Sequence, residues 1–177
     1  MSRKVILYIS MSLDGYLSKE NDDLSWLSTV EKPGEDYGYA QFNKEIDTYI
    51  VGKKTYDVIL SLTGGTFPQA AVHDCYVITR QKLNSENGVT FFNGSVNDLI
   101  QDLKSKPGKN IYCDGGATLV RMLLEDRLID EFRISIIPIL LGNGKRLFQP
   151  GFPEENLELI SSKSYDTGLI TLTYKPK

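Results

Sequence analysis

The sequence holds few of the residues from which metal centres and redox pairs are built. It has one histidine, His73, and two cysteines, Cys75 and Cys113, which are not spaced as a CxxC pair. A zinc motif with two histidines and a dithiol redox motif are therefore excluded within these 177 residues. Both cysteines lie in apolar runs, so we expect buried, unreactive thiols and no metal site.

Long apolar runs are also missing. No run approaches the roughly 18 apolar residues that a membrane-spanning helix requires. The apolar stretch 5–9 follows Arg3 and Lys4, but it is short and no cleavage site comes after it. It therefore predicts a first strand rather than a signal peptide, and we expect a cytoplasmic protein that does not bind membranes.

An excess of positive charge is missing as well. The chain has 20 lysines and arginines against 23 aspartates and glutamates, a net charge of −3, which argues against a nucleic-acid-binding protein. Hydrophobic residues make up 41% of the chain and charged residues 24%, which favours a globular fold over disorder. At about 150 residues per domain, we expect residues 1–177 to form a single domain.

The order of the remaining patterns indicates the fold class. Short apolar runs predict strands at residues 5–9, 48–51, 75–79, 89–92 and 111–113. Helical periodicity predicts helices at residues 37–46, 55–60, 96–103 and 117–125. Strands at 132–141, 157–165 and 169–174 follow without an intervening helix, with a turn at Asp166 to Gly168. We therefore predict an α/β fold, in which helices flank a mostly parallel central sheet that ends in antiparallel C-terminal strands.

Three turns after predicted strands are suited to anions, which bind beyond the carboxyl ends of parallel strands. One turn begins a helix with two lysines that oppose the helix dipole, and another has paired glycines that let a ligand approach the backbone. The candidate cofactor-binding residues are Gly52, Lys53, Lys54 and Thr55 in the first turn, Thr79 and Arg80 in the second, and Asp114, Gly115, Gly116, Ala117 and Thr118 in the third. Each turn is also compatible with no ligand at all, as a helix cap with solvated lysines, a plain basic loop or a tight turn.

The same turns resemble motifs of known reductases. Residues 50–56 read IVGKKTY and resemble the Met-Gly-Arg-x-Thr-Trp motif of dihydrofolate reductases, with Lys53 in the arginine position. Thr79 and Arg80 fall where those enzymes bind the 2′-phosphate of NADPH. The second half is more similar to the reductase domain of the bifunctional riboflavin-biosynthesis deaminase–reductase. The matching segments are 114–119 (DGGATL), 128–131 (LIDE) and 138–144 (PILLGNG), together with 11–15 (MSLDG).

The resemblance runs from about residue 5 to 148 and is nearest to the small stand-alone bacterial members of this superfamily. It implies a dihydrofolate reductase-like fold, NADPH as cofactor, hydride transfer and a homodimer. Riboflavin reductases continue with Asp-Asp-Pro where this chain has Tyr56, Asp57 and Val58. The substrate therefore stays open between 5-amino-6-(5-phosphoribosylamino)uracil and a dihydropterin. The alternative function is an NADP(H)-binding protein without reductase activity, either a sensor or a degenerate paralogue.

Hydride transfer also needs a proton donor near the acceptor atom. The resemblance gives this role to Asp14, in the loop that covers the nicotinamide in this superfamily, and to Asp36, whose spacing to Gly52 resembles that of the folate enzymes' catalytic acid. Asp114 is a third candidate, because riboflavin reductases carry an acid at this place. Trp26 is predicted to wall the substrate pocket. A plain turn at Asp14, a helix cap at Asp36 and simple packing of Trp26 are the open alternatives. The apolar run 132–141 and the uncovered last strands predict a homodimer.

Overall fold

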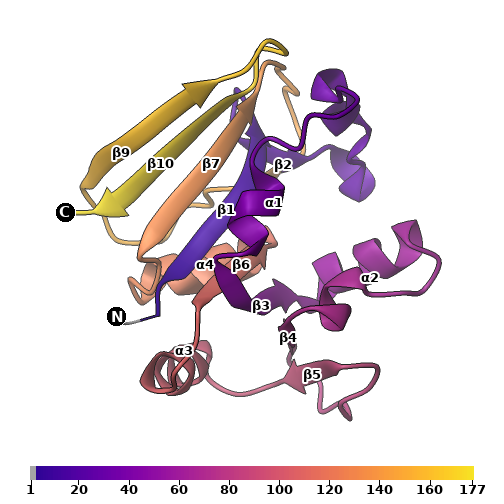
Figure 1. The fold of residues 1–177 in the computed structure, drawn as a ribbon, viewed down its shortest axis with the longest axis vertical. Coiled ribbons are helices and arrows are strands. Elements are labelled where there is room, and N and C mark those ends of the chain that lie inside the picture. Colours follow the sequence, from indigo (N-terminus) through magenta and orange to yellow (C-terminus); the bar gives the residue numbers. More distant parts are fainter. Residues whose placement is uncertain (1–2) are drawn as a thin grey trace.

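An eight-stranded sheet organises residues 3–177, the part of the chain that the computed structural model describes (Figure 1). Its strands are β1 (Val5–Ser12), β3 (Ile46–Gly52), β4 (Asp74–Ile78), β5 (Val89–Phe92), β6 (Asn110–Gly115), β7 (Glu131–Ile137), β9 (Leu157–Ser164) and β10 (Ile170–Pro176). Their spatial order is β5-β4-β3-β6-β1-β7-β10-β9. The strands from β5 to β7 are parallel, whereas β10 is antiparallel to both of its neighbours, which confirms the predicted fold class.

The strand β1 explains why the predicted runs are continuously apolar. It lies between β6 and β7, with Leu7 opposite Cys113 on one side and Phe132 on the other. Val5 and Leu7 point into one hydrophobic core and Ile6 into a second core on the opposite face of the sheet. Because both faces are covered, no position in the run is left for a polar side chain.

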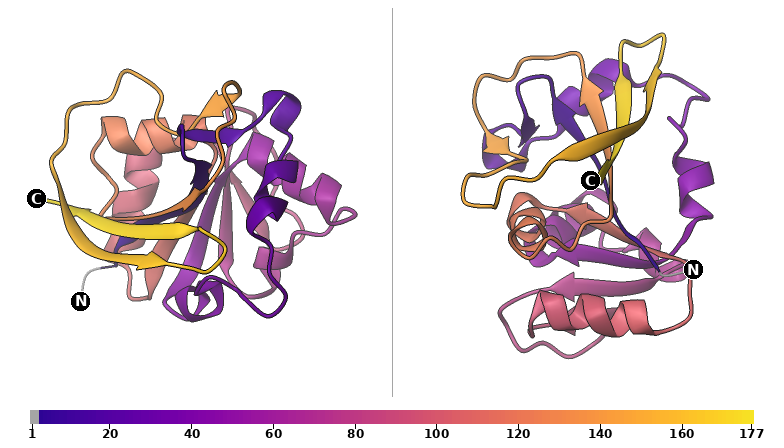
Figure 2. Two further views of the ribbon diagram at one scale, coloured as in Figure 1. Left: turned by 90° about the horizontal axis from the view of Figure 1, so that it is seen from above. Right: turned by 90° about the vertical axis from the view of Figure 1, so that its left-hand side faces the viewer.

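Helices lie on both faces of the sheet, as Figure 2 shows in the view from above. The helices α3 (Val96–Ser105) and α4 (Ala117–Glu125) cover the core that contains Leu7. The helices α1 (Tyr39–Asn43) and α2 (Lys53–Leu62) cover the other core. The start of α3 agrees with its sequence signal, since the Ser95 hydroxyl accepts a hydrogen bond from the Asp98 amide at 3.2 Å.

Two elements are shorter in the structure than the sequence predicts. The helix expected at 37–46 is reduced to five residues, because Tyr37 and Gly38 have φ values of 55° and 87°, in the left-handed region. The strand expected at 132–141 ends at Ile137, since Pro138 has no N–H to donate to a neighbouring strand.

Several short elements have no counterpart in the sequence prediction. They are the strands β2 (Tyr16–Ser18) and β8 (Lys145–Arg146) and the 3-10 helices η1 (Glu20–Asp22), η2 (Ser25–Val30) and η3 (Pro68–Ala71). β2 and β8 pair with each other in a small antiparallel sheet. Gly144 is required at that contact, because a Cβ there would lie 2.1 Å from the carbonyl oxygen of Ser18.

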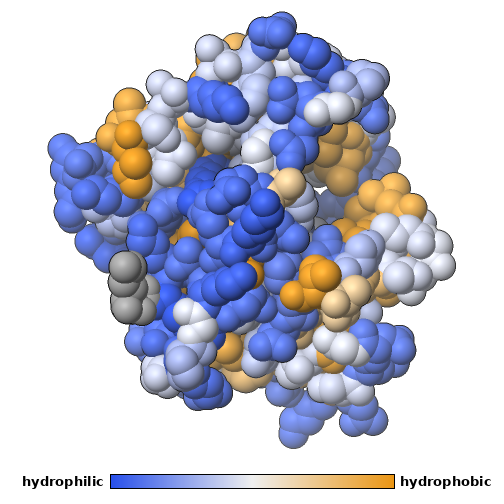
Figure 3. Space-filling view, viewed as in Figure 1, coloured by the Kyte–Doolittle hydropathy of each residue, from blue (hydrophilic) through white to orange (hydrophobic). Residues whose placement is uncertain are grey.

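The C-terminal hairpin forms as expected around the turn at Asp166 to Gly168. The Gly168 amide donates to the Tyr165 carbonyl at 2.9 Å, and Gly168 has a φ of 84°. Every residue of β9 is exposed, and the strand forms one edge of the sheet. Figure 3 shows apolar surface on this side of the molecule, at the upper left.

Both cysteines are buried and free, as predicted, and burial raises the pKa of the Cys113 thiol to about 12. Within residues 3–177, no helix combines the length and apolar character needed to cross a lipid bilayer.

Candidate active site

A cavity of about 1610 Å³ opens at the carboxyl ends of the central strands. It is lined by the turns that follow β3, β4 and β6, so the structure brings together the three turns singled out in the sequence. All of the predicted cofactor-binding residues line it except Gly115, which is buried behind the wall. Three turns far apart in the sequence therefore form one site, at the place where parallel sheets bind ligands.

Two helices point their N-termini at this cavity. The N-cap of α2 is Gly52 and that of α4 is Gly116, and neither residue can cap the helix with a side chain. The first amide groups of both helices are therefore free to bind an external acceptor. Together with the positive ends of the two helix dipoles, they make this wall suited to a phosphate or diphosphate.

The two turns approach each other so closely that glycine is needed at one contact. A Cβ on Gly116 would lie 2.8 Å from Thr55 Oγ1, whereas a Cβ on Gly52 would find no atom nearer than 3.7 Å. Gly116 thus allows α2 and α4 to begin side by side. This is the arrangement by which one diphosphate can contact both helix ends.

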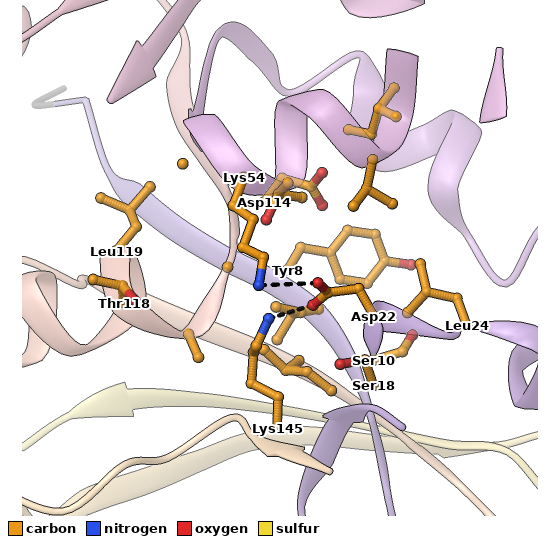
Figure 4. A pocket seen from close by; sticks show the side chains of 18 of the residues that line it. Tyr8, Ser10, Ser18, Asp22, Leu24, Lys54, Asp114, Thr118, Leu119 and Lys145 are labelled. Atoms are coloured by element: carbon orange, nitrogen blue, oxygen red, sulfur yellow. Dashed lines mark hydrogen bonds and ion pairs between the residues drawn. The ribbon is translucent and has the colours of Figure 1, made fainter. Parts of the chain in front are cut away.

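Basic side chains add positive charge to the same wall. Lys53 pairs with Asp57 at 2.5 Å, and Lys54 pairs with Asp22 at 3.0 Å. Arg80 lies exposed at the rim, after β4. Lys145, which the sequence analysis did not select, also lines the cavity and pairs with Asp22 (Figure 4). The sequence feature that could have indicated Lys145 is the preceding Gly142-Asn-Gly144 segment, which turns the chain back towards β2.

Asp114 is the acid in the floor of the cavity. Its Oδ1 accepts a hydrogen bond from the Tyr112 phenol at 2.5 Å, and its Oδ2 accepts one from the Tyr49 phenol. Burial raises the pKa of Asp114, and the two phenol hydrogen bonds offset only part of that effect. A carboxyl group of this kind exchanges a proton closer to neutral pH than an exposed aspartate does.

An aromatic wall, which was not predicted from the sequence, stands beside Asp114. Tyr8, Tyr37 and Tyr39 line the cavity together with Tyr112. The Tyr8 phenol donates to the Tyr37 carbonyl at 3.3 Å, and burial raises the pKa of Tyr8 to about 12. These rings come from β1, β6 and the segment around α1, so no local pattern could have grouped them. They provide a surface against which a planar heterocycle can pack.

Asp14 does not fit the role of proton donor that was predicted for it. Its side chain is not part of the cavity wall, and it accepts hydrogen bonds from the Ser12 hydroxyl and from the amides of Leu141 and Gly142. These bonds lower the pKa of Asp14 to about 2, against the opposing effect of desolvation. A carboxylate that stays charged and ties two loops together is a structural group.

Asp36 does line the cavity, but at its rim. Its carboxylate accepts hydrogen bonds from the amides of Ala40 and Gly38, both at 2.9 Å, and these bonds lower its pKa. The alternative of a helix-capping aspartate therefore describes its contacts better than that of a proton donor.

Trp26 lies outside the cavity wall, contrary to the prediction. It is 3% exposed and packs with Val30, Ile137 and Leu169 in a third hydrophobic cluster. Its neighbours in η2, Ser25 and Leu27, line the cavity instead. The 3-10 helix turns the indole inwards, an orientation that the sequence did not reveal.

Comparison with known proteins shows the family of the chain. The model of the RibD C-terminal domain matches residues 3–171. The chain belongs to the RibD C-terminal domain family. The uncharacterized protein YwjB of Bacillus subtilis (strain 168) is 39% identical over 166 residues, which cover 93% of this chain and 94% of YwjB. Membership of the RibD family supports a reductase-type function.

Solved structures of RibD-like proteins have the same fold. A crystal structure from Shewanella sp. PV-4, of a protein named for riboflavin biosynthesis, has a TM-score of 0.88 and 30% identity and covers 100% of this chain and 99% of its own. The diaminohydroxyphosphoribosylaminopyrimidine deaminase/5-amino-6-(5-phosphoribosylamino)uracil reductase of Thermotoga maritima has a TM-score of 0.74 and 13% identity. It aligns with 99% of this chain but with only 57% of its own length. These similarities confirm the dihydrofolate reductase-like fold.

Proposed function

We propose that the chain is an NADPH-dependent reductase that transfers hydride to a small heterocycle of the pyrimidine or pterin class. The substrates to test first are 5-amino-6-(5-phosphoribosylamino)uracil and a dihydropterin. The observation that carries the proposal is that three anion-suited turns and a partly buried acid, Asp114, line one cavity. RibD family membership supports the reductase class.

The residues present fit a dinucleotide phosphate. The uncapped N-termini of α2 and α4 offer amide donors for a diphosphate, in a cradle that a Cβ on Gly116 would fill. Lys53, Thr79 and Arg80 line the same wall and would hold the additional 2′-phosphate. When bound, NADPH supplies the hydride.

Asp114 is the proposed source of the proton. Reduction of a C=N or C=O bond adds a hydride to one atom and a proton to the other. Because burial raises the pKa of Asp114, a larger fraction of this carboxyl is protonated than of an exposed one. The Tyr49 and Tyr112 phenols orient the carboxyl and donate to its charged form after the proton has left. The aromatic wall would hold the heterocycle beside it.

The cofactor assignment is tested by titrating the protein with NADPH and NADH while following nicotinamide fluorescence. We expect NADPH to bind more tightly than NADH. The double variant Lys53→Ala, Arg80→Ala should lose roughly tenfold or more in NADPH affinity, because it removes charge-assisted hydrogen bonds to phosphate. Lys82→Ala is the matched control, since Lys82 is an exposed cation of the same loop that does not line the cavity. Unchanged NADPH binding in the double variant would remove this assignment.

The reductase activity is tested by following NADPH absorbance with each of the two substrate classes. Oxidation of NADPH that depends on one of them supports the proposal. Tight NADPH binding without reduction of any pyrimidine or pterin would instead favour the NADP(H)-binding protein without reductase activity. Failure to bind either nucleotide would leave only the shared fold.

We also propose that the protein is a homodimer formed through the C-terminal edge of the sheet. Among residues 3–177, no strand pairs with the outer edge of β9, and Leu159 and Ile160 are 52% and 50% exposed. A second copy of the chain can cover both the apolar side chains and the strand edge.

A further inference from the structure

Two lysines of the cavity share a single carboxylate. Lys54, at the start of α2, lies 3.0 Å from Asp22 Oδ2, and Lys145, at the start of β8, donates to Asp22 Oδ1. Figure 4 shows the two ammonium groups converging on this carboxylate inside the cavity. The two lysines come from distant parts of the chain, so Asp22 is what neutralises the charge where they meet.

The segment that carries Asp22 is held by polar contacts. No residue of η1 is buried, and the segment is fixed by pairs such as Lys19 with Asp23 at 3.5 Å and Asn143 with Glu20 at 3.4 Å. Asn21 and Asp22 have φ values of 58° and 59°, in the left-handed region that asparagine and aspartate adopt more readily than other non-glycine residues. A segment with no apolar anchor can leave its place without opening the core.

Ser18 adds a hydrogen-bond donor that has nothing to donate to. It lines the same cavity, the residue is 4% exposed, and its hydroxyl has no hydrogen-bond partner among residues 3–177. It stands opposite Lys145 in the β2–β8 pair. Buried hydroxyl groups are nearly always paired, so this one has hydrogen-bonding capacity left for a ligand oxygen.

We infer that Lys54, Lys145 and Ser18 form a subsite for one phosphate group of the ligand, and that Asp22 fills this subsite until the phosphate displaces it. The inference rests on the proposed function, because it assumes that the ligand of this cavity carries phosphate. A phosphate presents three acceptor oxygens, which two ammonium groups and one hydroxyl can satisfy together. It also carries more charge than the carboxylate it replaces.

The direct test is calorimetric titration with inorganic pyrophosphate. The variant Asp22→Asn keeps the shape of the side chain but removes the competing charge, so we expect it to bind pyrophosphate about tenfold more tightly than the unmodified protein. Asp23→Asn is the matched control, because Asp23 lies one residue further on, is exposed and does not line the cavity. It should bind as the unmodified protein does. Asp22→Ser gives the same comparison if the asparagine variant does not fold.

A second pair of variants locates the subsite. In the Asp22→Asn background, Lys145→Gln and Ser18→Ala should each return the affinity towards that of the unmodified protein. The inference is overturned if Asp22→Asn binds pyrophosphate no more tightly than Asp23→Asn. It is also overturned if adding Lys145→Gln leaves the gain in affinity unchanged, because the ligand would then bind elsewhere.

Two further ligands identify the source of the phosphate. If Asp22→Asn binds only NADPH more tightly, the subsite belongs to the cofactor. If it binds only ribose 5-phosphate more tightly, the subsite belongs to the substrate. Either result supports the subsite. If the unmodified protein binds and oxidises NADPH while Asp22→Asn changes no phosphate affinity, this inference fails and the proposed function stands. If no variant binds NADPH but the pyrophosphate gain depends on Lys145, the proposed function fails and the subsite stands.

Discussion

The phenol of Tyr112 donates a hydrogen bond to Asp114 Oδ1 at 2.5 Å, in the floor of the cavity. Tyr49 donates to the other carboxylate oxygen, so both oxygens of Asp114 are held by neighbours in the sheet. Burial is the larger influence on this group and raises its pKa, while the two phenols pull the pKa down. Opposing influences of this kind set the pH at which a buried acid gives up its proton.

Tyr112→Phe should shift the pH dependence of reduction towards higher pH. The substitution removes a hydrogen bond that favours the charged form of Asp114, so the pKa of Asp114 rises further. If Asp114 donates the proton, the fall of kcat on the alkaline side should move up by about one pH unit. The measurement is kcat as a function of pH, with whichever of the two proposed substrates the protein reduces. Tyr174→Phe, on β10 and outside the cavity wall, should leave the profile in place.

Asp114→Asn should lower kcat by roughly 10²–10⁴-fold, the usual contribution of a general acid, and should stabilise the fold at neutral pH. Because the pKa of Asp114 is higher in the folded than in the unfolded chain, its contribution to stability is favourable at low pH and is lost as pH rises through the folded value. Thermal melting of both proteins between pH 4 and pH 8 checks this. As pH rises, the melting temperature of the variant should increase relative to that of the unmodified protein. A difference in melting temperature that does not change with pH would contradict the raised pKa of Asp114.

Gly116→Ala should destabilise the protein by roughly 1–3 kcal/mol, the cost of overpacking a tight contact. The added Cβ would lie 2.8 Å from Thr55 Oγ1, at the place where α2 and α4 begin together. Gly52→Ala is the matched control, because it is also a helix N-cap and its Cβ would meet only ordinary contacts at 3.7 Å. Chemical denaturation measures both. Adding Thr55→Ala to Gly116→Ala should recover most of the loss, and no recovery would show that the strain lies elsewhere.

Asp14→Asn should make the stability of the protein depend less on pH at acid pH. Hydrogen bonds from Ser12, Gly142 and Leu141 lower the pKa of Asp14 from 3.8 to about 2. The carboxylate therefore contributes stability above its unfolded value, which is lost as pH falls from about 4 to about 2. Melting temperatures across that range should fall less steeply in the variant than in the unmodified protein. If the melting temperatures of the two proteins fall in parallel, the stabilising effect of these hydrogen bonds does not depend on the charge of Asp14.

Sedimentation at micromolar concentration should give the mass of a dimer, and Leu159→Lys should shift it to that of a monomer. The leucine is half exposed on the edge strand β9, where a lysine discourages strand pairing. Val72→Lys is the control, since Val72 is 65% exposed but follows η3, which lies next to β4. A monomer mass for the unmodified protein would refute the dimer. A dimer of Leu159→Lys would place the interface on another surface.

Elements whose signals are local could be predicted from the residues alone. The continuous apolar runs became the parallel strands, because a strand buried on both faces tolerates no polar position. The helix at Ala117–Glu125 begins and ends where its glycine turn and apolar stripe predicted. The three turns could be placed at one edge of the sheet, since the carboxyl ends of parallel strands share that edge. Where local backbone preference ran against the periodicity, as at Tyr37 and Gly38, the prediction was wrong.

The chemical state of each acid depends on long-range packing. Asp14, Asp36 and Asp114 are alike in sequence, but backbone amides hold the first two in the charged form, while burial raises the pKa of the third. The pairing of Asp22 with Lys54 and Lys145 depends in the same way on contacts between distant segments. Charge and burial at a site are sums over everything packed around it, and that packing exists only once the sheet has formed.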